Sequence, residues 1–424
     1  MFVASYAFWG LVLVVDQLLL PMFHVMGLPY KVSYFLVAFW GFDSFIARSR
    51  GITDPDKLRD FRRLAFAFAG IIGCAVLGEL LLAVNHIIIS YADTLNGTLF
   101  YILAALAFGL GLSSKKFNLK VLVWVFYTAV ALNLAFIFLR SSMPSWISNL
   151  YFTELDVQYL NLSNVDSVDK ILELGRPRGY FSNPDGSALV VNIIALFIYL
   201  GFRRKLLPPP STVSAIGIIF LPIVTSILLA SRGEFVVSVA LCVLNATVIF
   251  KDFSKLKRLK LVGVFFFLLA GCIFFVQAEN HEISSGLDRV SKILEILDKK
   301  DEDPNNKFEA RNQGITRPLL QFEVAYDRFL YSPLFGSGFS PAKGYPFTDG
   351  THYFHNDWFR LIVTSGIIGL VLMVWVIRKF CLPVGIAAII PWLLPGLVNT
   401  FMLNVAIFMF YFFMIGLFRG KLRH

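Results

Sequence analysis

The sequence predicts an all-α, polytopic membrane protein with about 12 transmembrane helices and a large, partly helical loop on the non-cytoplasmic side. Of its 424 residues, 57% are hydrophobic and only 16% are charged, against about 25% in an ordinary soluble domain. The apolar residues form long runs, and basic residues gather in alternate gaps between these runs. A soluble monomer could not bury so much apolar surface, so soluble enzymes, disordered chains and disulfide-rich modules are excluded.

The apolar runs define the expected helices, because a helix needs about 20 mainly apolar residues to cross a membrane. Runs of suitable length lie at about residues 4–24, 31–47, 64–89, 98–112, 121–139, 186–202, 212–230, 235–250, 261–278, 357–377, 382–397 and 400–418. The run at 382–397 contains three prolines, so a kinked or hairpin-like pair is an alternative there. The four cysteines lie inside apolar runs without Cys-x-x-Cys spacing, which predicts core packing and no metal site.

The basic residues predict the orientation, since cytoplasmic loops of membrane proteins are enriched in Lys and Arg. Of the 38 basic residues, 22 lie in the alternate gaps at about 48–63, 113–120, 203–205, 251–260, 378–379 and 419–423. Four acidic residues lie among them, so these gaps carry +18. The rest of this chain of net charge +10 therefore carries −8. Both termini are expected to be cytoplasmic, and the positive charge does not indicate a nucleic-acid partner.

This topology divides the chain into three parts. Residues 1–278 hold transmembrane helices 1–9, with a non-cytoplasmic segment at 140–185. Residues 279–356 form the large non-cytoplasmic loop, and residues 357–424 hold helices 10–12 and the cytoplasmic C-terminus. Long loops between membrane helices usually carry function.

The first polar cluster on the non-cytoplasmic side includes Arg176, Arg178, Asn183 and Pro184, directly before the helix expected at 186–202. Two arginines near a helix N-terminus suit a diphosphate, through bidentate guanidinium bonds and the helix dipole. An ordinary interfacial turn with snorkelling arginines is the alternative.

The second cluster, Ser231-Arg232-Gly233-Glu234, forms a very short connection between two helices. Arg232 lies at the membrane boundary, where it is either a topological stop or a charge that faces the bundle interior. Glu234 is an adjacent partner that would neutralise it.

The third cluster runs from His352 to Trp358, at the start of the helix expected at 357–377. His355 is suited to proton transfer near neutral pH and could accept a proton from an attacking hydroxyl. Asn356 or Asp357 would cap the helix. A plain cap beside an interfacial aromatic belt is the alternative.

Together these clusters resemble the O-antigen ligase and polymerase superfamily of bacterial envelope enzymes. The resemblance covers about residues 170–380, and the N-terminal half is similar only in hydropathy. The motifs that carry it, in chain order, are Arg178-Gly179 with Asn183-Pro184, Ser231-Arg232, the run Ser-Pro-Leu-Phe-Gly-Ser-Gly at 332–338, His355-Asn356, Gly366 and Gly369. The large loop between the ninth and tenth helices matches as well.

The resemblance implies a metal-independent glycosyltransferase that needs no cofactor and acts at the periplasmic face of the bacterial inner membrane. The donor would be a glycan on undecaprenyl diphosphate. A ligase would pass the glycan to a hydroxyl of the lipid A-core oligosaccharide in lipopolysaccharide biosynthesis, and a polymerase would pass it to a second lipid-linked repeat unit. Twelve helices with one dominant loop favour the ligase. The segment at 140–185 would also suit the polymerase.

The resemblance also implies roles for individual residues. Arg178 and Arg232 would hold the diphosphate and stabilise charge on the leaving group. His355 would act as general base on the acceptor hydroxyl or orient it. Further substrate contacts are expected from Arg176, Asn183, Arg311, Arg317 and Asn356.

A polytopic transporter or lipid-linked glycan flippase is a more distant alternative. Its signature would be ionisable groups near the middle of the bilayer, and Glu79 is the best such candidate, with Asp16 nearer a helix end. A hydrogen-bonded structural role for Glu79 is at least as well supported.

Overall fold

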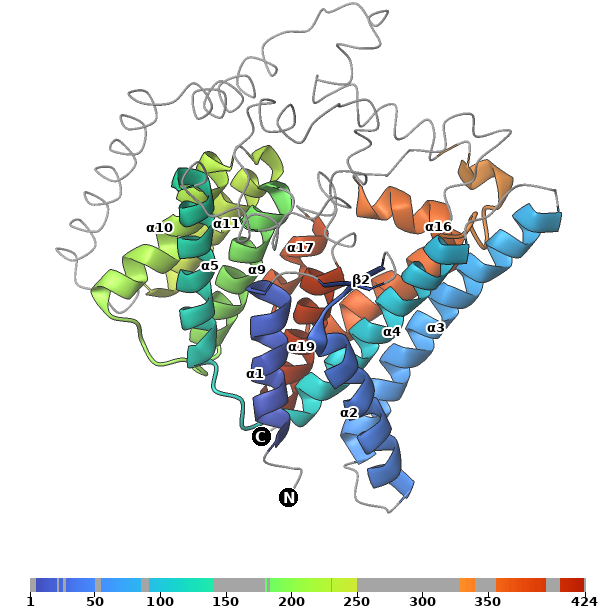
Figure 1. The fold of residues 1–424 in the computed structure, drawn as a ribbon, viewed down its shortest axis with the longest axis horizontal. Helices are drawn as coiled ribbons and strands as arrows, with labels where there is room; N and C mark the ends of the chain where they lie inside the picture. The colour runs from blue at the N-terminus through green and yellow to red at the C-terminus, as the bar shows by residue number, and fades with distance from the viewer. Residues whose placement is uncertain are drawn as a thin grey trace, which may run out of the picture. The chain divides into compact units, whose positions relative to one another are not determined.

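A computed structural model describes residues 5–20, 23–25, 28–49, 55–84, 91–139, 180, 184–229, 231–249, 326, 328–339, 356–393 and 405–422. These residues are almost entirely helical (Figure 1). Six of the described helices are long and apolar enough to cross a membrane. The predicted class, a helical polytopic membrane protein, is therefore confirmed. The number twelve stays a prediction, and the run expected at 261–278 lies outside the described residues.

The chain divides into two compact units. Unit 1 consists of Met1–Gln17, Val32–Phe117 and Glu302–His424, and unit 2 consists of Leu18–Lys31 and Asn118–Asp301.

The described helices of unit 1 are α1 (Ser5–Leu18), α2 (Val32–Ser49), α3 (Pro55–Val84), α4 (Tyr91–Ser113), α16 (Asp357–Val376), α17 (Ile390–Leu393) and α19 (Val405–Leu422). Helices α4 and α19 pack closely because a glycine on each lies against the backbone of the other. A Cβ on Gly111 of α4 would lie 2.1 Å from the Phe413 carbonyl oxygen, and one on Gly416 of α19 would lie 2.2 Å from that of Phe108. Such close backbone approach at small residues is typical of membrane helix pairs.

Four of the basic gaps belong to unit 1, and the helix ends beside them lie close together. The Arg419 Nε atom donates to Asp60 Oδ2 at 3.0 Å, and Arg419 Nη1 donates to the Lys379 carbonyl at 2.9 Å. Lys421 Nζ donates to the Lys115 carbonyl at 2.7 Å. Four of the basic gaps thus meet at one end of this unit, in agreement with the predicted alternation of the helices.

The helix expected at 4–24 is shorter than predicted. It ends at Leu18, and an antiparallel hairpin of β1 (Phe23–Val25) and β2 (Leu28–Tyr30) follows before α2 begins. Asp16 Oδ2 accepts from the Ser33 amide at 2.8 Å, so this carboxylate caps the first turn of α2. Asp16, a candidate of the transporter hypothesis, therefore has a structural contact.

The continuous helix expected at 382–397 is wrong over its described part. Helix α16 instead continues through a π-helical turn, η4 (Ile377–Cys381), and residues 382–384 form a turn. A 3-10 turn, η5 (Ile386–Ile389), and the short α17 follow. Pro383 and Pro391 supply no amide hydrogen for a regular helix, which explains the interruption. The helix expected at 98–112 is instead longer than predicted, because α4 has 23 residues.

Unit 2 contains α5 (Lys120–Phe138), α9 (Pro184–Arg203), α10 (Thr212–Leu228) and α11 (Arg232–Ile249). Helix α9 packs against the other three, and its side chains from Ser187 to Leu200 are buried. It begins two residues before the expected start because proline suits the first helical position. Ser211 caps α10, with its side chain accepting from the Ser214 amide.

Candidate functional site

The second predicted cluster lies at the start of α11, whose first residue is Arg232. The Ser231 amide donates to the Ser226 carbonyl at 3.0 Å, which closes the connection from α10. The Glu234 side chain is 0% exposed. Asn192 of α9 donates through Nδ2 to Glu234 Oε2 at 2.8 Å and to the Glu234 carbonyl at 3.0 Å. The side-chain amide of Asn192 therefore holds the first turn of α11 in place.

This contact belongs to a buried polar network that joins α9, α10 and α11. Ser238 Oγ lies 2.8 Å from Asn192 Oδ1 and 2.7 Å from Ser226 Oγ, and it also lies 3.1 Å from the Pro222 carbonyl oxygen. In a membrane, buried polar groups need such internal partners. The network sets the position of the N-terminus of α11, where the helix dipole favours anions.

The third predicted cluster lies at the start of α16. Asn356 Oδ1 accepts from the amides of Trp358 at 2.9 Å and Phe359 at 3.1 Å. Asn356 is thus the cap of the two candidates that the sequence offered. Trp358 Nε1 donates to the Trp392 carbonyl at 2.9 Å, and Trp392 Nε1 donates to the Tyr411 hydroxyl at 3.0 Å. The first turn of α16 is therefore tied to α17 and α19.

Helix α16 is broken at Gly366, whose φ of 63° and ψ of −164° are not helical. This region of backbone space is accessible essentially only to glycine. The break leaves carbonyls of the first half and amides of the second half without partners inside the helix. Inside a membrane protein these groups must be satisfied by other parts of the chain.

Residues 332–339, which we call the docking segment, supply those partners. Its amides at Ser337 and Gly338 donate to the Val363 and Thr364 carbonyls at 2.7 and 3.0 Å. In return, the carbonyls of Pro333 and Leu334 accept from the amides of Ile367 and Ile368, at 2.9 and 3.3 Å. Two regions that carry the family resemblance, the run at 332–338 and the helix containing Gly366, thus bind each other through their backbones.

The glycines of the docking segment allow this approach. Gly336 and Gly338 have φ values of 76° and 84°, which side chains disfavour. A Cβ on Gly336 would lie 2.5 Å from the Ser365 amide nitrogen, and one on Gly338 would lie 1.9 Å from Glu79 Cγ. The segment can therefore lie in direct backbone contact with α16 and beside α3.

Glu79 of α3 anchors the end of the docking segment. Its Oε1 accepts from the Phe339 amide at 2.8 Å, and its Oε2 accepts from Thr94 Oγ1 of α4 at 2.6 Å. The side chain is only 3% exposed. Helices α3, α4 and α16 run side by side in Figure 1, and Glu79 joins the docking segment to α3 and α4. These contacts favour the structural role over transport chemistry.

Sequence reasoning missed Arg328, which lies in the large loop shortly before the docking segment. Its side chain is 4% exposed, and burial lowers the pKa of the guanidinium to about 10. The group therefore stays protonated at neutral pH. No local sequence pattern indicates its burial, because that burial depends on how the large loop packs.

Most predicted site residues lie outside the described residues. These are His355, Arg178, Arg176, Asn183, Arg311, Arg317 and the side chain of Arg232. Most of the segment at 140–185 and of the large loop lies outside as well. The roles of these residues stay predictions.

Comparison with known proteins bears directly on the resemblance. Residues 217–374 match the model of a family described as O-antigen ligase. The matched region runs from α10 to α16 and includes Arg232, the docking segment, Asn356 and Gly366. No curated protein and no solved structure matches the chain. The family match confirms, over residues 217–374, the predicted resemblance to the O-antigen ligase and polymerase superfamily.

Proposed function

We propose that the protein is an O-antigen ligase that transfers a polysaccharide from undecaprenyl diphosphate to a hydroxyl of the lipid A-core oligosaccharide. The family match over residues 217–374 carries this proposal. The reaction takes place at the periplasmic face of the bacterial inner membrane, with both termini in the cytoplasm. The protein needs neither a metal ion nor a nucleotide sugar.

In the proposed reaction, the acceptor hydroxyl oxygen attacks the anomeric carbon of the donor sugar. The bond between that carbon and the diphosphate oxygen breaks, and the hydroxyl proton passes to His355. Arg178 and Arg232 stabilise the charge that develops on the leaving diphosphate. Arg176, Asn183, Arg311 and Arg317 supply further contacts to the substrates.

The contacts at the starts of α11 and α16 support the placement of Arg232 and His355 in this reaction. Arg232 begins α11, whose first turn is held by the buried Asn192 and Glu234 contacts. His355 directly precedes Asn356, which caps α16, and the docking segment braces that helix at its break. Arg232 and His355 thus lie in the chain at helix N-termini that are held by hydrogen bonds. Asn356 has two cap contacts, so we assign it to placing His355 as well as to contacting substrate.

A polymerase that joins lipid-linked repeat units is the second candidate. It uses the same donor and the same residues, and differs in the acceptor. The family match fits both activities. A transporter or flippase is less well supported, because the carboxylates proposed for it, Glu79 and Asp16, have structural contacts.

We expect His355→Ala and Arg232→Ala each to lower glycan transfer about 100-fold or more, the usual range for a lost general base and for a lost electrostatic contact to the transition state, while protein levels in the membrane stay unchanged. Polysaccharide attached to lipid A-core, separated by gel electrophoresis, measures this. Arg59→Ala is a matched control, because Arg59 is exposed and lies 2.9 Å from Asp56 within the same helix. Wild-type transfer by the His355 or Arg232 variant would exclude the assigned roles.

A further inference from the structure

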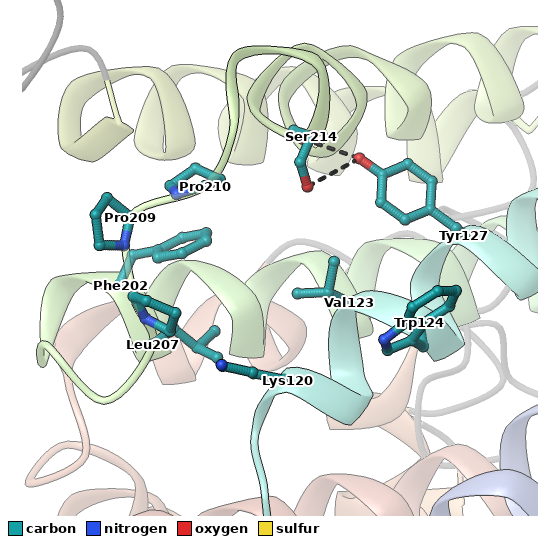
Figure 2. A pocket seen from close by; sticks show the side chains of 10 residues that line it. Lys120, Val123, Trp124, Tyr127, Phe202, Leu207, Pro209, Pro210 and Ser214 are labelled. Atoms are coloured by element: carbon teal, nitrogen blue, oxygen red, sulfur yellow. Dashed lines mark hydrogen bonds between the residues drawn. The ribbon is translucent and has the colours of Figure 1, made fainter.

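A cavity of about 350 Å³ lies in unit 2, where α5 begins, α9 ends and α10 begins (Figure 2). Its lining is mostly apolar and consists of Val123, Trp124, Phe202, Leu207, Pro208, Pro209 and Pro210, with Lys120, Tyr127 and Ser214 as the polar members. The Tyr127 hydroxyl donates to the Ser214 carbonyl at 2.9 Å. The space therefore combines an apolar wall with one cationic side chain.

The chain between α9 and α10 forms a preshaped wall of this cavity. The amides of Leu206 and Leu207 both donate to the Gly201 carbonyl, at 2.8 and 3.2 Å, and end α9. Lys205 adopts a left-handed φ of 55° within this turn. Three consecutive prolines then restrict the backbone up to the Ser211 cap of α10. The wall is thus held by backbone hydrogen bonds and by the restricted backbone of the prolines.

The cavity opens where a membrane interface is expected. Trp124 lies in the second turn of α5 and is 76% exposed, and Val213 at the start of α10 is 80% exposed. Tryptophan is enriched at the boundary between lipid and water. Figure 2 shows Trp124 and Tyr127 toward one end of the cavity, and Leu207, Pro209 and Pro210 toward the other. Lipid is the medium that meets these exposed apolar side chains.

Positive charge surrounds the same ends of the helices. Lys120 begins α5, and Arg203, Arg204 and Lys205 end α9 and start its connection to α10. Within 118–139 and 184–229, Asp185 is the one acidic residue, and it lies about 27 Å away along α9 by helix rise. Basic pockets between helices on the cytoplasmic side bind anionic lipid headgroups. The charge therefore selects an anionic lipid over a zwitterionic one.

We propose that this cavity binds an anionic phospholipid of the cytoplasmic leaflet. The phosphate lies beside Lys120 and the basic end of α9, and part of an acyl chain lies against Val123 and Trp124. The cavity volume of about 350 Å³ is near the lower limit for small-molecule sites, so it accommodates only part of a lipid. The remainder of the lipid lies along the exposed helix surface. The proposal depends on the predicted orientation and not on glycan transfer.

Quenching of tryptophan fluorescence tests the proposal on the full-length protein in detergent micelles. The probes are phosphatidylglycerol and phosphatidylcholine with brominated acyl chains, and subtracting the signal of Trp124→Phe isolates Trp124. We expect half-maximal quenching by phosphatidylglycerol at about fivefold lower mole fraction, the factor expected from one lysine at a lipid surface. Lys120→Gln should remove most of this difference.

Lys116→Gln is the matched control, because Lys116 is an exposed lysine of the same basic gap and does not line the cavity. The control should keep the preference for phosphatidylglycerol. Equal quenching by both lipids, or an unchanged preference in Lys120→Gln, would overturn the proposal. So would the absence of Trp124 quenching by either lipid, since the cavity would then be filled by the protein itself.

Discussion

Replacing Gly366 by alanine is expected to displace the docking segment and to remove most glycan transfer. An alanine Cβ would lie 2.3 Å from the Leu334 carbonyl oxygen and 2.7 Å from the Gly336 amide nitrogen. The backbone conformation alone would cost about 1–3 kcal/mol for a residue other than glycine. Because the obstructing atoms belong to the backbone, a side-chain rotation cannot relieve the clash. Thermal unfolding in detergent, together with transfer activity in membranes, measures both effects.

Gly73→Ala is the control for this substitution. Gly73 lies within α3, and a Cβ there would meet no atom within 4 Å. Alanine favours a helix over glycine by about 1 kcal/mol, so this variant should be as stable as the wild type or more so. If Gly366→Ala unfolds at the same temperature as Gly73→Ala and transfers glycan equally well, the docking of residues 332–339 on α16 is incorrect.

Glu79 is expected to tolerate glutamine and not alanine. Glutamine can accept from the Phe339 amide through its oxygen and donate to Thr94 Oγ1 through its nitrogen, so both contacts of the carboxylate are retained. Alanine removes the acceptor of a partly buried amide and a partly buried hydroxyl, at a cost for each group toward the lower end of about 1–3 kcal/mol. We expect near wild-type transfer from Glu79→Gln, and a lower unfolding temperature with reduced transfer from Glu79→Ala.

The same pair of variants separates anchoring from carboxylate chemistry. A transporter that uses Glu79 to carry a proton or an ion needs its charge, and glutamine cannot supply it. An inactive Glu79→Gln variant with the unfolding temperature of the wild type would contradict the anchoring role and favour transport. A Thr94→Val variant, which removes one of the two contacts, should lie between the wild type and Glu79→Ala in stability.

The helical architecture could be predicted well because it depends on local composition. The apolar runs place α5, α10 and α16 within a few residues of their observed bounds. The cap at Asn356 has a local signal in its own sequence, since asparagine before an apolar run is a common helix start. The position of the basic gaps likewise reports which helix ends lie together, as the Arg419 and Lys421 contacts illustrate.

The break at Gly366 and the docking segment could not be derived from periodicity. The run from Leu361 to Val376 is apolar on both sides of the break, so hydropathy indicates one continuous helix. The partner of the broken backbone precedes it by about 30 residues, and the Glu79 anchor lies 260 residues from Phe339. Sequence spacing carries no information about such pairs. The resemblance singled out these glycines, and the structure explains why glycine is required.

The sequence contains a local indication of the buried polar network at Asn192, which the prediction did not include. It is a single amide within an apolar transmembrane run, where polar side chains are expensive and usually have a partner. That partner, Glu234, lies on another helix and could not be identified from the sequence. Arg328 is a comparable case, because its burial depends on tertiary packing of the large loop.

The proposed transfer is tested most directly with the purified protein and an undecaprenyl-diphosphate-linked glycan donor, offered lipid A-core and a second lipid-linked repeat unit in separate reactions. We predict glycan attached to lipid A-core and release of undecaprenyl diphosphate, without added nucleotide or metal ion. Elongated lipid-linked glycan as the sole product would contradict the ligase and establish the polymerase. No product with either acceptor, from protein that unfolds cooperatively, would contradict glycan transfer altogether.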